Sequence, residues 1–562
     1  MIRTVARALD DAAASAGAYT FVDKDGAEHD VPFPVLRDSA RALGGALRAR
    51  GLDRGDRVAL VIPEAAGFLT TFLGASAAGL VPTPLVDPGH AGENVAYLEM
   101  VAPLLRAARA RAIVTTPSLL PLLARVRVSA PTISFVSAWS ELTGRALAAE
   151  STDPSAPALL QFTSGSTSQP RGVVLTHANL AANIHAIGGP AGIDISHADV
   201  GVSWLPLFHD MGLIGLALCP LYFGCRGVFL SAAAFLKRPA VWLQTIARHR
   251  GTVSFAPNFA YEMCVRRVKD AELDGLDLSS WRVAGCGAEP IQAATLEAFA
   301  AKLARAGFRD TSFVAAYGLA EHTLAVALAR DRGLRVDTIR APELAAHRRA
   351  VPCSPNAPSV ARLVSCGRPF PDHALRIVDD HGHPVGERVV GEILVSGPSV
   401  MQGYLSDLGA PADVVRDGWL STGDLGYLAD GELFVCGRRK ETIIVAGRNY
   451  FPQDLERVVN RVPGVRSGRV AAFAAVEPGH PDRAVVVVET QGAVPADALQ
   501  AEVRRRVLQA TGLAVHEIVL APKGTIGRTT NGKLRRAELR DRYAAGTLVH
   551  SRPRERSRQE PG

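Results

Sequence analysis

Residues 159–179 read LLQFTSGSTSQPRGVVLTHAN. After an apolar run, hydroxyl side chains and glycine crowd together at Thr163, Ser164, Gly165, Ser166 and Thr167. Backbone N–H groups and hydroxyls on a glycine-bent turn form a cradle for phosphate oxygens. Glycine permits the positive φ and the close backbone approach that such a turn needs. A Ser/Thr-rich surface loop explains this stretch equally well, so the other segments of the chain have to distinguish the two interpretations.

Length and composition indicate a globular protein with more than one domain. A chain of 562 residues is too long for a single hydrophobic core, and 48% hydrophobic with 21% charged residues is ordinary for soluble folds. Residues 1–17 read as the start of an amphipathic helix, so no targeting segment is expected. The most apolar region, 211–235, is broken by Pro220 and Arg226, which predicts buried core and no membrane span. The seven cysteines form no C-x-x-C pair, which predicts a cytoplasmic location and no structural zinc.

The net charge of +7 is unevenly distributed. From Arg438 to the C-terminus there are 23 Lys+Arg against 13 Asp+Glu, a net of +10, which leaves −3 for the preceding 437 residues. A basic C-terminal part can meet an acidic partner, although ordinary surface charge and a basic tail also explain it. Basic and aromatic residues are not interleaved as in nucleic-acid-binding proteins, so no nucleic-acid partner is expected.

Strand-like and helix-like segments alternate along the first two thirds of the chain. This alternation predicts an α/β fold in which helices cover the sheets. The segments from which it is inferred are the strand-like runs 57–62, 112–116, 253–255 and 281–284 and the helical stretch 65–77.

The expected secondary structure changes twice towards the C-terminus. Residues 375–436 contain short strands separated by Asp-Gly and His-Gly turns, which predicts a β-rich subdomain. A compact α+β unit with a strand near 484–489 and a helix near 498–508 follows. We therefore expect a large N-terminal domain over 1–437, a hinge at 438–440, a small mobile C-terminal domain over 441–545, and a disordered tail at 546–562.

Three short motifs carry side chains that suit nucleotide chemistry. His209-Asp210 lies in WLPLFHDMG, where a helix cap beside a core histidine is the plainer interpretation. In AYGLAEHT, Tyr317 can stack on a base and Glu321 can hold Mg²⁺ against phosphate, although an acidic residue in a first helical turn gives the same pattern. In STGD, Asp424 follows a glycine turn and can accept hydrogen bonds from ribose hydroxyls; a simple turn aspartate is the alternative.

Two glycine-rich segments are excluded as nucleotide-binding folds of other classes. Residues 527–534, GRTTNGKL, fit G-x-x-x-x-G-K. However, Leu534 replaces the Ser/Thr that would bind Mg²⁺, and too little chain follows for a P-loop domain. Gly285-Cys-Gly287-Ala-Glu-Pro290 is not G-x-G-x-x-G, so a dinucleotide-binding fold has little support.

Taken together, these segments resemble the adenylate-forming superfamily over about residues 20–545. Within it the chain is most similar to the fatty acyl-AMP ligases, at 203–214, 257–261, 278–283 and 363–369. Gly367 follows Glu321 by 46 positions, which looks like the insertion that restrains the C-terminal domain and disfavours CoA as acceptor in that family. The segments that carry the superfamily resemblance are TSGST and PRG, WLPLFHDMG, GAEP, YGLAE, STGD, GRRKE and TTNGK.

The resemblance implies that a carboxylate attacks the α-phosphorus of ATP, which gives acyl-AMP and pyrophosphate, with Mg²⁺ as cofactor. The acyl group would then pass to the phosphopantetheine thiol of an acyl carrier protein, and antibiotic or other specialised-metabolite biosynthesis is the implied setting. The implied roles are catalysis by Lys533, Glu321, His209 and Thr163; phosphate binding by Thr163, Ser164, Gly165, Ser166 and Thr167; nucleoside binding by Gly287, Ala288, Glu289, Tyr317, Gly318, Asp424 and Arg438; metal binding by Glu321; a substrate pocket of His209, Asp210, Phe255, Asn258 and His322; and a hinge at Lys440.

Three positions depart from the family pattern and bear on the substrate. Phe255 stands where a smaller residue is usual and can shorten an acyl tunnel, Cys286 replaces an asparagine, and His322 follows Glu321 directly. A histidine there can hydrogen-bond a polar substrate or act as a base. These departures favour a short, aryl or polar acid. Adenylylation of nitrite for diazotisation of an aryl amine, acyl-CoA synthesis, and a non-catalytic role remain as alternatives.

Overall fold

A computed structural model gives the fold of ten stretches of the chain. No helix among them is long and apolar enough to cross a membrane. The described stretches are 2–23, 25–89, 95–149, 152–163, 171–330, 333–405, 414–475, 482–492, 494–528 and 534–548.

The central element of the N-terminal domain is a nine-stranded sheet of order β17-β14-β13-β12-β11-β9-β10-β1-β2. The six strands from β13 to β1 are parallel, and an antiparallel strand or pair closes each edge. Parallel strands need crossover connections, which the chain supplies as helices. The strands are β1 Ala18–Val22, β2 Glu28–Pro32, β9 Val200–Ser203, β10 Arg226–Phe229, β11 Val253–Ala256, β12 Val283–Cys286, β13 Phe313–Gly318, β14 Ala325–Leu328 and β17 Arg368–Pro369. The helices of this region are α6 His177–Gly188, α8 Ala232–Lys237, α9 Ala240–His249, α10 Asn258–Arg267 and α11 Ala293–Leu303.

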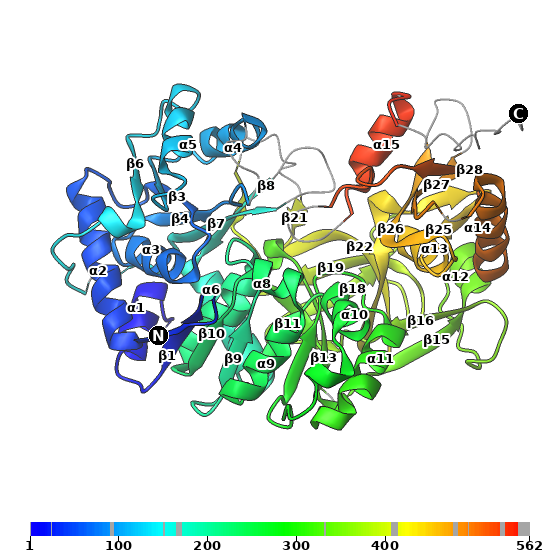
Figure 1. The fold of residues 1–562 in the computed structure, drawn as a ribbon, viewed down its shortest axis with the longest axis horizontal. Helices are drawn as coiled ribbons and strands as arrows, with labels where there is room; N and C mark the ends of the chain where they lie inside the picture. Colours follow the sequence, from blue (N-terminus) through cyan, green and yellow to red (C-terminus); the bar gives the residue numbers. More distant parts are fainter. Residues whose placement is uncertain are drawn as a thin grey trace, which may run out of the picture.

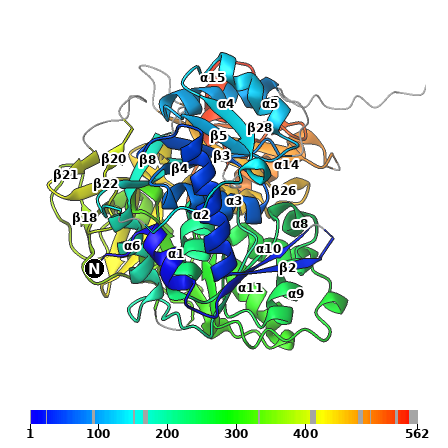
Figure 2. The same cartoon turned by 90° about the vertical axis from the view of Figure 1, so that its left-hand side faces the viewer.

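A second, four-stranded parallel sheet of order β4-β3-β5-β6 lies beside the N-terminal helices (Figure 1). Helices α2 and α3 pack so closely that a Cβ on Gly44 would lie 2.5 Å from the Gly74 carbonyl oxygen, and Figure 2 shows both helices facing the viewer. The predicted α/β alternation is confirmed here. The elements are α1 Val5–Ala12, α2 Phe33–Ala49, β3 Arg57–Val61, α3 Ala65–Ala77, β4 Val81–Pro84, α4 Val95–Ala107, β5 Ala112–Thr115, α5 Leu120–Ala124 and β6 Phe135–Ala138.

The apolar stretch 211–235 is buried core, as its sequence predicted. It forms a π-helix at Met211–Leu218, then α7 Cys219–Phe223, then β10. Left-handed Gly224 ends α7 with φ +66°, and its amide donates to Leu221 O.

A β-rich subdomain follows, built on the long hairpin of β22 Trp419–Ala429 and β23 Glu432–Arg438. Asp430 and Gly431 form its two-residue turn, both with positive φ, which is the geometry of Asp-Gly hairpins. Register in the hairpin places Asp424 opposite Arg438. The remaining strands of this sheet are β18 Ala374–Val378, β19 Gly391–Ser396 and β21 Val415–Arg416. A separate three-stranded sheet contains β7 Pro157–Thr163, β8 Arg171–Thr176 and β20 Gly403–Tyr404.

The last part of the described chain has its own apolar clusters, which draw almost entirely on residues from Ile443 onward. Its sheet has the order β26-β27-β28, with helices packed on it (Figure 1). The expected strand and helix near 484–489 and 498–508 are present. The elements are β24 Ile443–Val445, β25 Arg448–Tyr450, α13 Pro452–Val459, β26 Val465–Ala475, β27 Arg483–Thr490, α14 Ala496–Thr511, β28 Glu517–Ala521 and α15 Arg536–Ala544.

The predicted insertion between Glu321 and Gly367 folds as β15 Val336–Arg340, α12 Ala341–His347 and β16 Val360–Val364. Strands β15 and β16 pair with each other in a two-stranded sheet. The insertion thus forms a small unit that packs against the C-terminal part, because Ala345 of α12 joins the apolar cluster of that part.

We expect acid destabilisation through His177. This side chain is 2% exposed, and its Nδ1 accepts a hydrogen bond from the Val5 amide at 3.3 Å. Burial lowers the pKa of His177 from 6.5 to about 4. As pH falls, the unfolded chain therefore binds a proton on His177 before the folded chain does. The stability that the neutral ring confers is present above pH 6.5 and is lost as pH falls from there through about 4.

In urea unfolding, wild-type protein should lose about 2–3 kcal/mol more unfolding free energy between pH 7 and pH 4 than the non-titrating variant His177→Gln. Equal pH slopes for the two proteins would contradict the assignment.

Candidate active site

A cavity of about 1610 Å³ opens between the large sheet, the β-rich subdomain and the C-terminal unit. Residues from all three parts line it, including Gly287, Tyr317, Asp424, Arg438 and Arg528. Segments more than 200 positions apart in the chain therefore meet at one site. Gly287 follows the parallel strand β12, and Tyr317 lies near the end of the parallel strand β13. The carboxyl ends of such strands are where α/β sheets bind ligands.

The loop with the hydroxyl-rich sequence starts and ends at this cavity. Thr163 is the last residue of β7 and Arg171 the first of β8, and the two are paired across the strands. Both side chains line the cavity. Ser164, Gly165, Ser166 and Thr167 lie outside the described residues.

A charged hydrogen-bonded group marks the predicted ribose position. Tyr317 donates its hydroxyl to Asp424 Oδ2 at 2.7 Å, and Arg438 Nε lies 3.2 Å from Asp424 Oδ1. Burial and the Asp424 charge raise the pKa of Tyr317 well above its ordinary value. The carboxylate of Asp424 is thus held between Tyr317 and Arg438, with its position fixed by the β22–β23 register.

The turn before Asp424 is held by a residue that the sequence did not single out. Glu392 on β19 accepts hydrogen bonds from Ser421 Oγ and from the Gly423 amide, and it pairs with Arg439 at 2.7 Å. Gly423 has φ +71°, a conformation that favours glycine. No local pattern distinguishes Glu392 from other strand glutamates, so only the fold identifies it.

Gly287, Ala288 and Glu289 form a tight turn after β12. A Cβ on Gly287 would lie 2.9 Å from the Ala316 carbonyl oxygen, and Ala288 has φ +66°. Glu289 Oε1 accepts a hydrogen bond from the Phe259 amide at 2.6 Å. This contact fixes the turn against the start of α10, and the backbone of the turn lines the cavity.

Glu321 lies on a 3₁₀ turn at Ala320–His322. Its Oε1 accepts a hydrogen bond from the Tyr404 hydroxyl at 2.6 Å, and the Arg171 guanidinium lies over the Tyr404 ring, 5.2 Å from its centroid. In the described part of the chain, no three His, Cys, Asp or Glu side chains gather as a metal site. A single carboxylate on the cavity wall suits Mg²⁺, which is usually bound by one or two carboxylates together with substrate phosphates.

Phe255 also lines the cavity. Its ring packs over Gly285, where an added Cβ would lie 2.0 Å from the ring. Asn258 also lines the cavity and accepts a hydrogen bond from the Gln292 amide at 2.9 Å.

The His209-Asp210 pair combines a structural contact with a position on the cavity. His209 Nδ1 lies 2.6 Å from Asp210 Oδ1, and the Met211 amide donates to Asp210 at 2.7 Å at the start of the π-helix. Both His209 and Asp210 line the cavity.

The structure corrects the prediction that His322 lines the substrate pocket. Its side chain is fully buried and is absent from the cavity wall. Nδ1 makes a 3.0 Å hydrogen bond with the Ala325 carbonyl oxygen, and the ring lies 5.2 Å from that of His373. Burial and His373 lower the pKa of His322 to about 4. The imidazole therefore points into the core, although His322 directly follows Glu321 in the chain.

Lys533 lies outside the described residues, but its neighbours on both sides reach the cavity. Arg528 and Leu534 pair in a β-bridge and both line the cavity. Lys440, the expected hinge, also lines the cavity and is exposed on a 3₁₀ turn directly after β23.

Comparison with known proteins agrees with this geometry. Residues 9–405 match the AMP-binding enzyme family, and residues 440–552 match the AMP domain of Disco-interacting protein 2-like proteins. A putative acyl-CoA synthetase of Caulobacter vibrioides is 39% identical over 92% of this chain and 91% of its own. The long-chain-fatty-acid–AMP ligase FadD26 of Mycobacterium marinum is 36% identical over 94% of each chain.

Two further similarities come from a carrier-protein ligase and a solved structure. JamA of Moorena producens, a medium-chain-fatty-acid–[acyl-carrier-protein] ligase, is 36% identical over 94% of this chain and 93% of its own. A solved structure from work on the fatty acyl-adenylate ligases of E. coli and L. pneumophila has a TM-score of 0.90 at 37% identity, over 97% of this chain and 98% of its own. The chain therefore belongs to the AMP-binding enzyme family and is an AMP-forming acid ligase related to the fatty acyl-AMP ligases.

Proposed function

We propose that this enzyme adenylates a carboxylic acid with an apolar chain and passes the acyl group to the phosphopantetheine thiol of a carrier protein in the cytoplasm. The observation that carries the choice of acceptor is the contact between the insertion and the C-terminal unit. The relative JamA supports it, since its name states transfer to an acyl carrier protein.

In the first step a carboxylate oxygen of the acid attacks the α-phosphorus of ATP. The new acyl O–P bond forms as the bond from the α-phosphorus to the bridging oxygen breaks, and pyrophosphate leaves with the electron pair. Catalysis of such transfers rests on positioning and charge neutralisation. Asp424, Arg438 and Tyr317 hold the nucleoside, and the hydroxyl-rich loop that starts at Thr163 cradles the phosphates. Lys533 provides the cation between the carboxylate and the α-phosphate.

Mg²⁺ fits this arrangement with Glu321 as its protein ligand, and it supplies neutralisation of phosphate charge. Tyr404 donates to one carboxylate oxygen and so limits the orientations of the Glu321 carboxylate. His209 lines the same cavity, and its proposed role is to orient the acid.

The insertion ties the C-terminal unit to the N-terminal domain. Asn449 Nδ2 donates to the Ala345 carbonyl oxygen at 3.4 Å, and Ser359 Oγ donates to the Gln509 carbonyl oxygen at 3.4 Å. On its other side, Arg362 makes a bidentate pair with Glu297 of α11, at 2.6 and 3.1 Å. Rotation about Lys440 has to break the first two contacts.

This restraint favours a protein acceptor over CoA. A carrier protein brings its own interface, whose contacts offset the cost of releasing the insertion, whereas the thiol end of CoA offers little such surface. The net charge of +10 after residue 437 suits an acidic carrier, and complementary charge accelerates encounter. The buried position of His322 removes one of the departures that favour a short, aryl or polar acid.

The acceptor is tested by loosening the insertion. Ala345→Arg places a charge in the apolar contact with the C-terminal unit, so the restraint weakens. CoA thioester formation should rise roughly tenfold, the equivalent of about 1.4 kcal/mol, while hydroxylamine-trapped acyl-AMP stays near the wild-type level. Ala346→Arg on the same helix is the matched control. Wild-type protein that makes CoA thioester as fast as it loads carrier protein would refute the proposal.

Loss of the Lys533 cation should remove adenylation. We expect Lys533→Ala to cost about 3–4 kcal/mol in the rate of ATP–pyrophosphate exchange, the size of losing one preorganised group at a developing charge. Lys523→Ala changes a lysine of the same domain that is absent from the cavity wall and serves as control. Exchange by Lys533→Ala within a few-fold of wild type would end the assignment.

The nucleoside site is tested at Asp424. Asp424→Asn keeps an acceptor for Tyr317 but removes the charge that pairs with Arg438 and binds the ribose. The KM for ATP should rise roughly 10- to 100-fold, in line with about 1.5–3 kcal/mol for a charged hydrogen bond, with little change in melting temperature. Asp430→Asn in the hairpin turn is the control. An unchanged KM would place the ribose elsewhere.

A further inference from the structure

Residues near both ends of the parallel strands line the cavity. Gly287 follows β12 at the edge where the nucleotide residues lie, whereas Arg282 immediately precedes β12 at the opposite edge. Four residues of strand span about 13 Å. Groups around Arg282 therefore lie one strand length away from Gly287, at the amino ends of the parallel strands.

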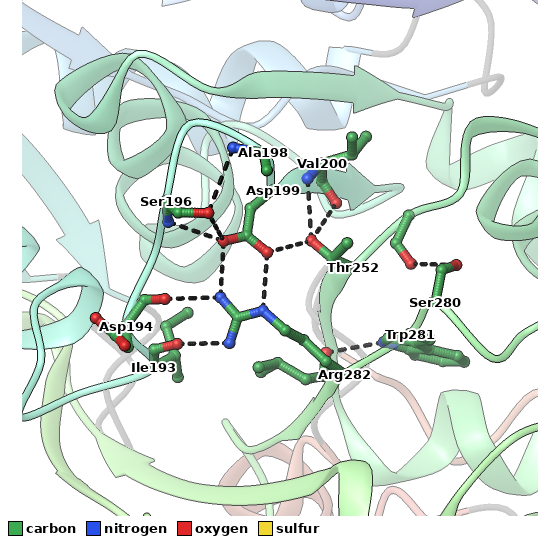
Figure 3. Close-up of polar contacts among 12 residues, drawn as sticks. Ile193, Asp194, Ser196, Ala198, Asp199, Val200, Thr252, Ser280, Trp281 and Arg282 are labelled. Carbon is green, nitrogen blue, oxygen red and sulfur yellow. Dashed lines mark hydrogen bonds and ion pairs between the residues drawn. The ribbon is translucent and has the colours of Figure 1, made fainter.

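At this distal edge Arg282 clamps the loop between α6 and β9 (Figure 3). Its guanidinium donates to the carbonyl oxygens of Ile193 at 2.7 Å and Asp194 at 2.9 Å. It also makes two 2.8 Å hydrogen bonds with the carboxylate of Asp199. One side chain thus fixes both arms of the loop, and Asp194 has φ +50°, a strained conformation that these bonds stabilise.

The carboxylate of Asp199 is itself fully satisfied. Thr252 Oγ1 donates to it at 2.6 Å and the Ser196 amide at 2.8 Å, and its side chain is 7% exposed. Burial alone would raise the pKa of Asp199, but the hydrogen bonds from Arg282 and Thr252 lower it to about 2. The clamp is therefore a permanent ion pair at physiological pH. Breaking one partner leaves a buried charge uncompensated.

The clamped loop brings an apolar side chain to the cavity. Ile193 is 8% exposed and lines the cavity together with Ile187, whose carbonyl oxygen accepts a 2.7 Å hydrogen bond from the Ile193 amide. Phe255 and Leu328 line the same cavity. Ile195, two residues on in the same loop, does not contribute to the cavity wall.

We infer that Ile193 is the end wall of the acyl part of the cavity, and that the Arg282–Asp199 pair positions this wall and so sets the longest acid that the enzyme adenylates efficiently. The inference rests on the proposed apolar-chain substrate. It predicts straight-chain acids whose chain runs along the parallel strands from the nucleotide edge to the loop.

The wall is tested by changing the size of residue 193 and measuring ATP–pyrophosphate exchange for straight-chain acids of increasing length. Ile193→Ala should raise kcat/KM roughly tenfold or more for acids one or two methylenes longer than the wild-type optimum. Ile193→Trp should lower kcat/KM for the optimal acid by a similar factor. These sizes are expected because one methylene in a hydrophobic pocket changes selectivity by about 10- to 200-fold. Ile193→Val is a milder variant that should shift the profile in the same direction as Ile193→Ala. Ile195→Ala is the matched control and should leave the profile unchanged.

The positioning role is tested with Arg282→Lys, which keeps the charge but loses the fork that reaches Ile193, Asp194 and Asp199 together. The KM for the longest acids should change at least several-fold while kcat for short acids stays near wild type; a purely structural role would lower the melting temperature without moving the chain-length profile. An unchanged profile in the Ile193 variants of an active enzyme would overturn this inference alone. Absence of exchange with every straight-chain acid in wild-type protein would overturn the proposed substrate class as well.

Discussion

The parallel alignment of six strands in the large sheet is the constraint on which the site depends. Because all their carboxyl ends share one edge, the segments that follow β11, β12 and β13 meet there although they are about 30 residues apart in sequence. Asn258, Gly287 and Tyr317 reach the cavity for this reason. The β22–β23 hairpin then brings Asp424 against Tyr317 from a separate sheet, and this contact joins the subdomain to the large sheet.

The carboxylates of Asp424 and Glu321 at the cavity each have a hydrogen-bonding partner. Asp424 sits between Tyr317 and Arg438, and Glu321 is bound to Tyr404, which in turn contacts Arg171. An isolated buried carboxylate would be costly, but each of these has a partner and faces a cavity open to a polar ligand. The same hydrogen bonds limit the rotamers of the carboxylates, so binding ATP orders few additional side chains.

Local sequence patterns predicted helices and strands well, but they predicted poorly where individual side chains point. The apolar run at 57–62 and the helical stretch at 65–77 became β3 and α3, because burial and periodicity are encoded locally. His322 shows the limit: its motif places it beside Glu321, yet its ring is buried against Ala325 and His373, both of which lie outside the motif's local pattern. Glu392 and Ile193 carry no sequence signal, since their roles arise only when the β-rich sheet or a distant arginine reaches them.

The two ends of the parallel strands also separate the residues proposed for adenylation from those proposed to select the acid. The groups proposed to orient ATP lie at the carboxyl ends of the strands, where small displacements are costly to catalysis. The loop held by Arg282 lies at the amino ends of the four-residue strands and lines the cavity through Ile193. A change of wall there alters the volume available to an acyl chain without moving Asp424 or Glu321. One scaffold can therefore keep its adenylation machinery constant while different members of the family accept different acids.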